Sequence, residues 1–198
     1  MELMDYPDSN MKEKKKKHTG LIIFIVILIA AAIVGFAIVQ NVKKAEYYSD
    51  METISYTMLD GAAKAEDAGN LIKSVWHNAI FEERDAKTDK YTIENGKFVD
   101  DFNDALDNLF EDEEFINSIS EIKNNQSEST DLMRKLTSPP KKYEEAYSVL
   151  KIYYDNYLKM TNTVISPSGS LNTFSEDFNS YDTETVDSYQ KMKLYLEP

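Results

Sequence analysis

One uninterrupted apolar segment near the start of the chain constrains its structure more than any other feature. The 19 residues from Leu21 to Val39 contain no charged side chain. As an α-helix they would be roughly 28 Å long at about 1.5 Å per residue, close to the ~30 Å thickness of the hydrocarbon core of a bilayer. Apolar side chains occur on every side of this helix, whereas a buried core helix rarely carries Ile, Leu, Val and Phe on every side at this length. The segment therefore predicts a transmembrane helix over residues 21–42.

A cleaved secretory signal is the alternative interpretation of this segment. The apolar region of such a signal is usually about 7–15 residues long and is followed by small residues at the cleavage site. The one tolerable cleavage signature, Gly35-Phe36-Ala37, lies inside the apolar run. A lipoprotein signal is excluded because the chain has no cysteine to acylate. The sequence favours a retained anchor.

Basic residues flank the apolar run unequally. Five lysines occupy the six positions from Lys12 to Lys17, whereas only Lys43 and Lys44 follow the run. Cytoplasmic flanks of membrane helices carry an excess of Lys and Arg. We therefore expect residues 1–20 to form a basic cytoplasmic tail in a single-pass protein of the plasma membrane. The same lysines are also suited to binding anionic lipid on the cytoplasmic face.

The remaining residues, 43–198, would then form one extracytoplasmic domain, for which 156 residues suffice. They include 17 Lys and Arg and 31 Asp and Glu, a net charge of −14, which argues against nucleic acid as a partner because phosphates are bound by basic surfaces. The absence of cysteine excludes disulfides and thiolate metal sites. Tyr47 and Tyr48 follow the apolar run closely, and we expect them to lie at the outer headgroups as an aromatic belt.

Apolar and small residues spaced by three and four positions predict a long amphipathic helix after the membrane segment. No proline occurs between residues 21 and 84, so the membrane helix can continue into it. Trp76 is expected to anchor the core at the far end of this seam. The seam consists of Met51, Ile54, Met58, Gly61, Ala62, Ala65, Ala68, Gly69, Ile72, Val75, Trp76 and Ala79.

A short hairpin and a second helical pattern follow. Asn95-Gly96 between β-prone residues is typical of a type I′ turn. Apolar residues at helical spacing then extend from Phe98 to Leu136 but become sparse over residues 123–130. The pattern predicts either one long helix or two helices joined near Asn124.

Two further helical patterns complete the chain. Pro139-Pro140 interrupts the preceding helix, and "SPSGS" at residues 166–170 predicts a turn with Ser168 or Ser170 as a helix cap. The predicted fold is all-α: a transmembrane helix followed by an antiparallel four- or five-helix bundle, with room for one short β-hairpin. The two apolar stripes are Tyr143, Tyr147, Leu150, Tyr154, Tyr157 and Thr161, and then Leu171, Phe174, Phe178, Tyr181, Tyr189, Met192 and Leu196.

Motifs of known chemistry do not occur in the sequence. It contains no G-x-S-x-G, no H-E-x-x-H and no phosphate-binding glycine loop. His77 is the one histidine beyond the membrane segment, and we expect it to be structural or at the surface. The sequence therefore predicts a protein without enzymatic activity and without a metal or other cofactor.

Two features are candidates for an interaction surface. Carboxylates spaced by four, three, four and three positions are predicted to share one helix face, either as a solvated face or as a site for a cation or a basic partner. A straight helix face offers few ligands to one ion, so we expect no tight calcium site. Tyr153 lies beside the centre of its stripe and would be the tyrosine most exposed if the bundle opened at one end. The carboxylates are Asp100, Asp104, Asp107, Glu111 and Glu114.

The stretch "PPKKYEEAYSVLKIYYDNYLKMTNTVISPSGSLNTFS" resembles the small helical extracytoplasmic domains of uncharacterised single-pass membrane proteins from Gram-positive bacteria. The resemblance covers about the last third of the chain. It implies a place in the cell envelope and no activity. We therefore expect a non-catalytic binding or scaffolding module with a protein or cell-envelope partner. A sensory or signalling ectodomain that works with a membrane partner is the alternative, since a tail of about 20 residues is too short for an output domain.

Overall fold

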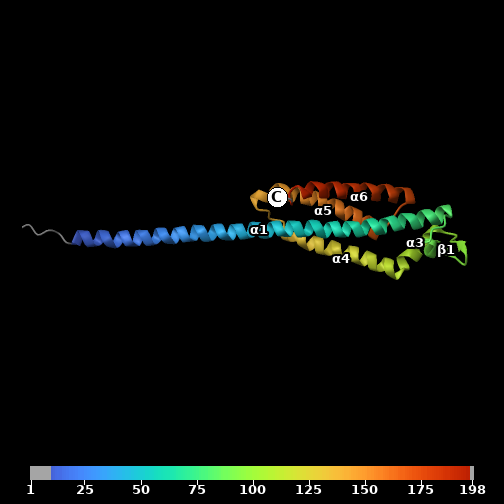
Figure 1. Cartoon of the computed structure of the whole chain (residues 1–198), viewed down its shortest axis with the longest axis horizontal. Helices are drawn as coiled ribbons and strands as arrows, with labels where there is room; N and C mark the ends of the chain where they lie inside the picture. Colours follow the sequence, from blue (N-terminus) through green and yellow to red (C-terminus); the bar gives the residue numbers. More distant parts are fainter. Residues whose placement is uncertain (1–9, 197–198) are drawn as a thin grey trace, which may run out of the picture. The chain divides into compact units, whose positions relative to one another are not determined.

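The computed structural model describes the backbone of residues 10–196 and the side chains of residues 24–196. In this part of the chain, six α-helices, one 3-10 helix and one two-stranded sheet occur, so the prediction of a mainly helical protein is confirmed (Figure 1). The elements are α1 (Asn10–Phe81), α2 (Asp89–Thr92), β1 (Ile93–Glu94), β2 (Lys97–Phe98), α3 (Phe102–Glu111), α4 (Glu113–Lys135), η1 (Lys141–Tyr143), α5 (Glu144–Ile165) and α6 (Leu171–Lys193).

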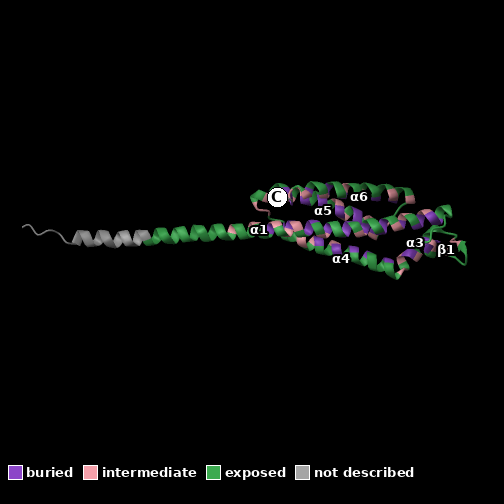
Figure 2. Cartoon of the chain, viewed as in Figure 1, coloured by how far each residue is buried: buried purple, intermediate pink, exposed green. Residues whose placement is uncertain are grey.

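The chain divides into two units, the first ending at Glu46 and the second beginning at Tyr47. In the first unit, every described side chain from Phe24 to Val39 is exposed, as the green part of α1 in Figure 2 shows. Among the described residues, α1 is the one helix long and apolar enough to cross a membrane, with a mean hydropathy of 2.5 over its most apolar window and none of that window buried.

The second unit is built around the part of α1 that begins at Tyr47. All twelve seam residues predicted from the sequence, from Met51 to Ala79, are buried, which confirms that interpretation of the pattern. Trp76 is among them, with 4% of its surface exposed. The buried faces of α4, α5 and α6 complete one continuous hydrophobic core (Figure 2).

Hydrogen bonds and ion pairs between helices fix the directions in which they run. On α1 and α4, Asn125 donates to the Thr57 carbonyl and Glu121 pairs with Lys64, so residue numbers rise on α1 while they fall on α4. These two helices are therefore antiparallel. By the same reasoning, α5 runs parallel to α1, because Tyr153 donates to the Ser55 carbonyl and Tyr157 lies beside Gly61.

The last helix, α6, lies beside α5 and runs antiparallel to it (Figure 1). Asn156 donates to the Glu184 carbonyl at 3.2 Å, and the rings of Tyr153 and Tyr189 lie 5.7 Å apart. The loop between the two helices ends at Ser170, whose hydroxyl accepts from the Thr173 amide at 3.2 Å. The prediction that Ser168 or Ser170 caps this helix is thus confirmed for Ser170.

Gly69 allows α1 and α6 to approach closely. A Cβ atom at Gly69 would lie 2.3 Å from Cε2 of Phe178, a ring that is itself buried and stacked on Phe174. Alanine normally stabilises a helix by about 1 kcal/mol relative to glycine. At this position overpacking costs about 1–3 kcal/mol, so Gly69→Ala is expected to lower the midpoint of urea unfolding of the full chain in detergent.

The matched control is Gly35→Ala, the same substitution on the same helix at a position with no neighbouring atom within 4 Å. It is expected to leave the midpoint of the second unit unchanged. A midpoint that rises for Gly69→Ala would show that the Phe178 ring can move aside at little cost.

The predicted hairpin is confirmed in the short sheet. Ile93 pairs with Phe98 and Glu94 with Lys97 in antiparallel register. The two turn residues both have positive φ, +50° at Asn95 and +80° at Gly96, as a type I′ turn requires.

The helices α3 and α4 match neither predicted alternative, one long helix or two helices joined near Asn124. The break lies at Asp112, whose backbone is extended with ψ of 128°. The Asp112 carboxylate accepts from the amides of Glu114 and Phe115, both at 3.1 Å, and so caps α4. Residues 123–130, which were expected to be a weak or broken segment, are helical.

Tyr47 and Tyr48 lie at the start of the second unit. Tyr47 is buried, and its hydroxyl donates to the Leu136 carbonyl at 2.9 Å. Burial raises the pKa of Tyr47 to about 12. The Tyr48 hydroxyl donates to the Leu196 carbonyl, and the rings of Tyr47 and Tyr143 stack at 5.6 Å. These bonds join the point where the chain enters the unit to the ends of α4 and α6.

Candidate functional site

The five candidate carboxylates do not share one helix face, so that prediction is wrong. Asp100 precedes α3, and Glu114 belongs to α4, beyond the break at Asp112. The other three members, Asp104, Asp107 and Glu111, lie on α3, and all five side chains are exposed. Within the described residues, no three His, Asp or Glu side chains are arranged to hold a metal ion. The group is an exposed acidic region distributed over two helices and a loop.

Lys90 forms ion pairs with two carboxylates at the start of α4, Asp112 and Glu114. Its ammonium group lies 2.9 Å from the Asp112 carboxylate and 3.8 Å from that of Glu114. The hydrogen bond from Lys90 lowers the pKa of Asp112, and the amides at the start of α4 act in the same direction. The acidic cap of α4 is thus partly neutralised within the unit, while the carboxylates on α3 remain free to interact with solvent or a partner.

Tyr153 is not exposed, contrary to the expectation that it would be the most accessible tyrosine. Its side chain has no exposed surface, and its hydroxyl donates to the Ser55 carbonyl at 3.3 Å. Desolvation strongly raises the pKa of Tyr153. Leu150, Tyr157 and Thr161 of the predicted stripe are buried, whereas Tyr147 and Tyr154 are half-buried at its edge. Tyr153 belongs to the core and offers no binding surface.

A buried polar cluster lies between α1, α4 and α5, and the sequence did not reveal it. The Asn125 amide group donates to the Thr57 carbonyl at 2.9 Å, and its oxygen accepts from the Tyr157 hydroxyl at 2.6 Å. Gly61 provides the space, because a Cβ atom there would lie 2.1 Å from the Asn125 oxygen. The detectable signal was the spacing of Asn125 from Ile122 and Ser129, which continues the buried face of α4 through polar residues.

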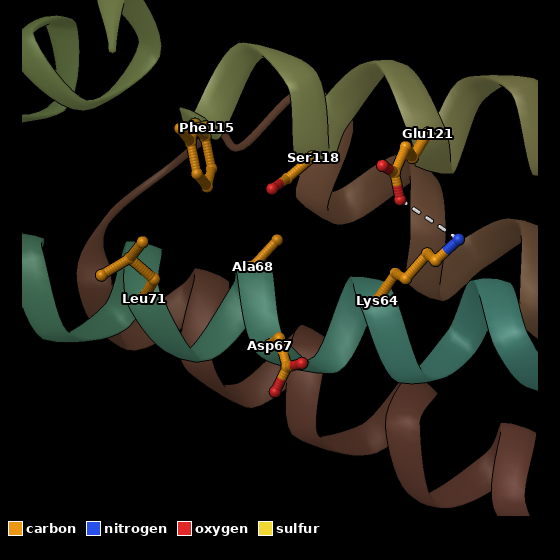
Figure 3. A pocket seen from close by; sticks show the side chains of 7 residues that line it. All are labelled: Lys64, Asp67, Ala68, Leu71, Phe115, Ser118 and Glu121. Carbon is orange, nitrogen blue, oxygen red and sulfur yellow. Dashed lines mark ion pairs between the residues drawn. The ribbon is translucent and has the colours of Figure 1, made fainter. Parts of the chain in front are cut away.

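A small surface hollow lies between α1 and α4 and has a volume of about 180 Å³ (Figure 3). Small-molecule sites are usually about 300–1,000 Å³, so this hollow is small for an organic ligand. The Lys64 ammonium lies 3.0 Å from Asp60 and 3.2 Å from Glu121, and the hydrogen bond to Asp60 raises the pKa of Lys64. The residues that line the hollow are Lys64, Asp67, Ala68, Leu71, Phe115, Ser118 and Glu121.

Lys64 and Glu121 of this hollow face one another, while Asp67 points away from both (Figure 3). In Figure 3 the dashed line joins Lys64 to Glu121 across the opening. Because the cation is held between two carboxylates, it has little capacity left for an anionic ligand. The arrangement serves as an interhelical ion pair.

His77 lies half-exposed near the far end of α1. Its ring packs on Phe81 at 4.6 Å, and Nδ1 lies 3.3 Å from the Asn78 side-chain oxygen and 3.8 Å from Glu83. Neither Asn78 nor Glu83 offers a hydroxyl nucleophile to the ring. These contacts are those of a surface histidine at a helix end.

Comparison with known proteins gives no assignment: no family model, no curated protein and no solved structure matches the chain.

Proposed function

We propose that this chain is a membrane-anchored, extracytoplasmic helical module that binds or scaffolds a protein or another component of the cell envelope without catalysing a reaction. The observation that carries the proposal is the apolar part of α1, whose described side chains from Phe24 to Val39 are exposed on all sides. Exposing so many large apolar side chains to water is highly unfavourable, whereas lipid solvates them.

The charge asymmetry supports the orientation. By the positive-inside rule, the lysines at residues 12–17 favour a cytoplasmic N-terminus, and the second unit would then lie outside. Its long helices, α1 from Tyr47, α4, α5 and α6, alternate in direction in the manner of an antiparallel four-helix bundle, with α3 and the hairpin as an addition to it. Such a unit supplies a stable exposed surface, which fits a binding or scaffolding role.

Protease accessibility tests this proposal. When protease is added to intact cells or protoplasts, the second unit of the full chain is expected to be digested while an N-terminal fragment remains in the membrane. A tag at each terminus distinguishes the two products on a blot. Full-length protein that remains protected, or a mature protein that begins near Ile38, would contradict the retained anchor or its orientation.

A sensory ectodomain is the second candidate function, and the continuity of α1 favours it. This helix includes both the apolar segment and the seam of the second unit. A ligand that altered the packing of α1 would act on the same helix that enters the membrane. Such an ectodomain would pass its signal to a partner in the membrane. Crosslinking in membranes that recovers one defined integral protein, lost when the second unit is deleted, would favour this candidate.

A further inference from the structure

Three segments meet where the chain enters the second unit, and together we call them the basal layer. They are residues 47–49 of α1, residues 132–143 from the end of α4 through η1, and residues 188–196 at the end of α6. The hydrogen bonds of Tyr47 to Leu136 and of Tyr48 to Leu196 hold them together. The layer is therefore defined by contacts within the second unit.

The basal layer differs sharply in charge from the rest of the unit. Within these bounds it contains six basic residues and no Asp or Glu, a net charge of +6, while Glu145, just beyond them, hydrogen-bonds with Tyr195 of the layer. The other residues of 47–196 contain nine Lys and Arg against 29 Asp and Glu, a net charge of −20. The net charge of −14 for residues 43–198 as a whole conceals this separation. The six are Arg134, Lys135, Lys141, Lys142, Lys191 and Lys193.

Several of these charges are available to an external partner. Lys135, Lys141 and Lys191 are exposed, and no ion pair joins them to a described acidic residue. Lys142 lies over the ring of Tyr143 at 5.1 Å, which leaves its ammonium at the surface. Arg134 pairs with Asp131 at 2.8 Å, just outside the layer.

Leu194 adds an apolar group to this basic surface. With 76% of its surface exposed, it is the most exposed large hydrophobic residue in the described part of the chain. It lies between Lys193 and Tyr195, which are both partly buried. Basic residues around an exposed apolar side chain are typical of surfaces that bind at the boundary between headgroups and acyl chains.

Chain connectivity brings this layer to a bilayer if the proposed anchor is correct. The predicted membrane helix ends at residue 42, and Tyr47 already belongs to the layer. Five residue steps span at most roughly 18 Å even when fully extended, whatever the orientation of the two units. Electrostatic screening acts over about 8 Å at physiological ionic strength. The charges nearest the surface therefore dominate, and the acidic remainder of the unit is largely screened.

We propose that the basal layer docks on anionic lipid headgroups of the outer leaflet around the anchor, with Leu194 inserted at the headgroup boundary. This inference rests on the proposed membrane anchor and goes beyond it. Each basic residue near an anionic surface strengthens binding about fivefold, so three lysines should change the ratio of docked to undocked unit on the order of 100-fold.

The test uses the full chain in lipid nanodiscs, labelled at one engineered cysteine, since the natural chain has none. Ser138→Cys places an environment-sensitive fluorophore in the basal layer, and Ala86→Cys places it outside; both positions are exposed. We expect the label at 138 to be protected from an aqueous quencher in discs containing phosphatidylglycerol but not in discs of phosphatidylcholine alone. The label at 86 should be accessible in both.

Matched variants isolate the role of the basal charges. Lys135→Gln, Lys141→Gln and Lys191→Gln together should abolish the protection. Lys87→Gln, Lys97→Gln and Lys123→Gln together remove the same charge from exposed positions outside the layer and should leave it intact. Circular dichroism should show equal helicity for both triple variants.

The possible results of this experiment distinguish a failure of the docking proposal from a failure of the membrane anchor. A chain that fails to enter discs refutes the anchor itself, whereas a chain in discs whose label at 138 is equally accessible with and without anionic lipid refutes only the docking. Two triple variants that behave alike also refute it. Protection that requires added soluble polyphosphate, in discs of either composition, would identify a phosphate polymer as the occupant and overturn the lipid proposal.

Discussion

Replacing Trp76 with alanine is expected to lower the free energy of unfolding of the second unit by about 3–5 kcal/mol, the usual range for removing a buried aromatic side chain. Trp76 is 4% exposed and packs against Phe102 of α3 and Phe174 of α6, with ring centroids 6.4 Å and 5.9 Å away. It thus joins three helices. Because domains are stable by only about 5–15 kcal/mol, the loss would be a large part of the total.

Urea unfolding of the full chain in detergent, followed by far-ultraviolet circular dichroism, measures this effect. Trp76→Phe should cost much less, because the indole Nε1 has no hydrogen-bond partner among the described residues and the substitution removes no bond. Phe81→Ala serves as the matched control, since Phe81 lies on the same helix with 59% of its surface exposed. Equal midpoints for Trp76→Ala and Phe81→Ala would show that Trp76 does not anchor the core.

Asn125→Ala is expected to cost about 2–4 kcal/mol, because it removes a buried hydrogen-bonding group and leaves a small cavity. The Tyr157 hydroxyl would lose its acceptor at 2.6 Å, and the Thr57 carbonyl would lose a donor at 2.9 Å. Tyr157 has no exposed surface, so water cannot readily replace the lost partner. The loss should appear as a lower urea midpoint.

Asn124→Ala is the matched control for this prediction. It removes the same chemical group from the neighbouring position of α4, where the side chain is exposed, and alanine is the better helix former. The control should therefore be neutral or slightly stabilising. If both variants unfold at the same urea concentration, the cluster of Asn125, Tyr157 and Thr57 contributes nothing to stability.

Local patterns were sufficient wherever the structure depends on residues close in sequence. The seam of α1 follows from apolar and small residues at steps of three and four, and all of its predicted members are buried. Asn95-Gly96 predicted the hairpin because its turn needs two residues with positive φ. The turn at residues 166–170 predicted a helix start capped by Ser168 or Ser170, and the cap is Ser170, whose hydroxyl accepts from an amide three residues later.

Tertiary packing decided the features that local patterns could not. The expected joint near Asn124 is absent because Asn125, a polar residue, is buried through partners on α1 and α5. Tyr153 is buried and Tyr154 is half-buried because neighbouring helix positions differ by about 100° in direction, and only the placement of α1 and α6 fixes which one faces inward. The acidic residues were assigned to one face because Asp112 was not recognised as a cap.

The separation of the basic basal layer from the acidic remainder of the second unit shows most clearly what tertiary packing decides and local sequence patterns do not. By itself, the sequence determined that the chain has an apolar segment long enough to cross a bilayer, a helical remainder and a net charge of −13. The basic residues of the basal layer come from segments almost 60 positions apart, and no short sequence window contains them all. They gather because antiparallel helices return the ends of α4 and α6 to Tyr47 and Tyr48. Where charges meet is a property of packing, which periodicity along the chain does not encode.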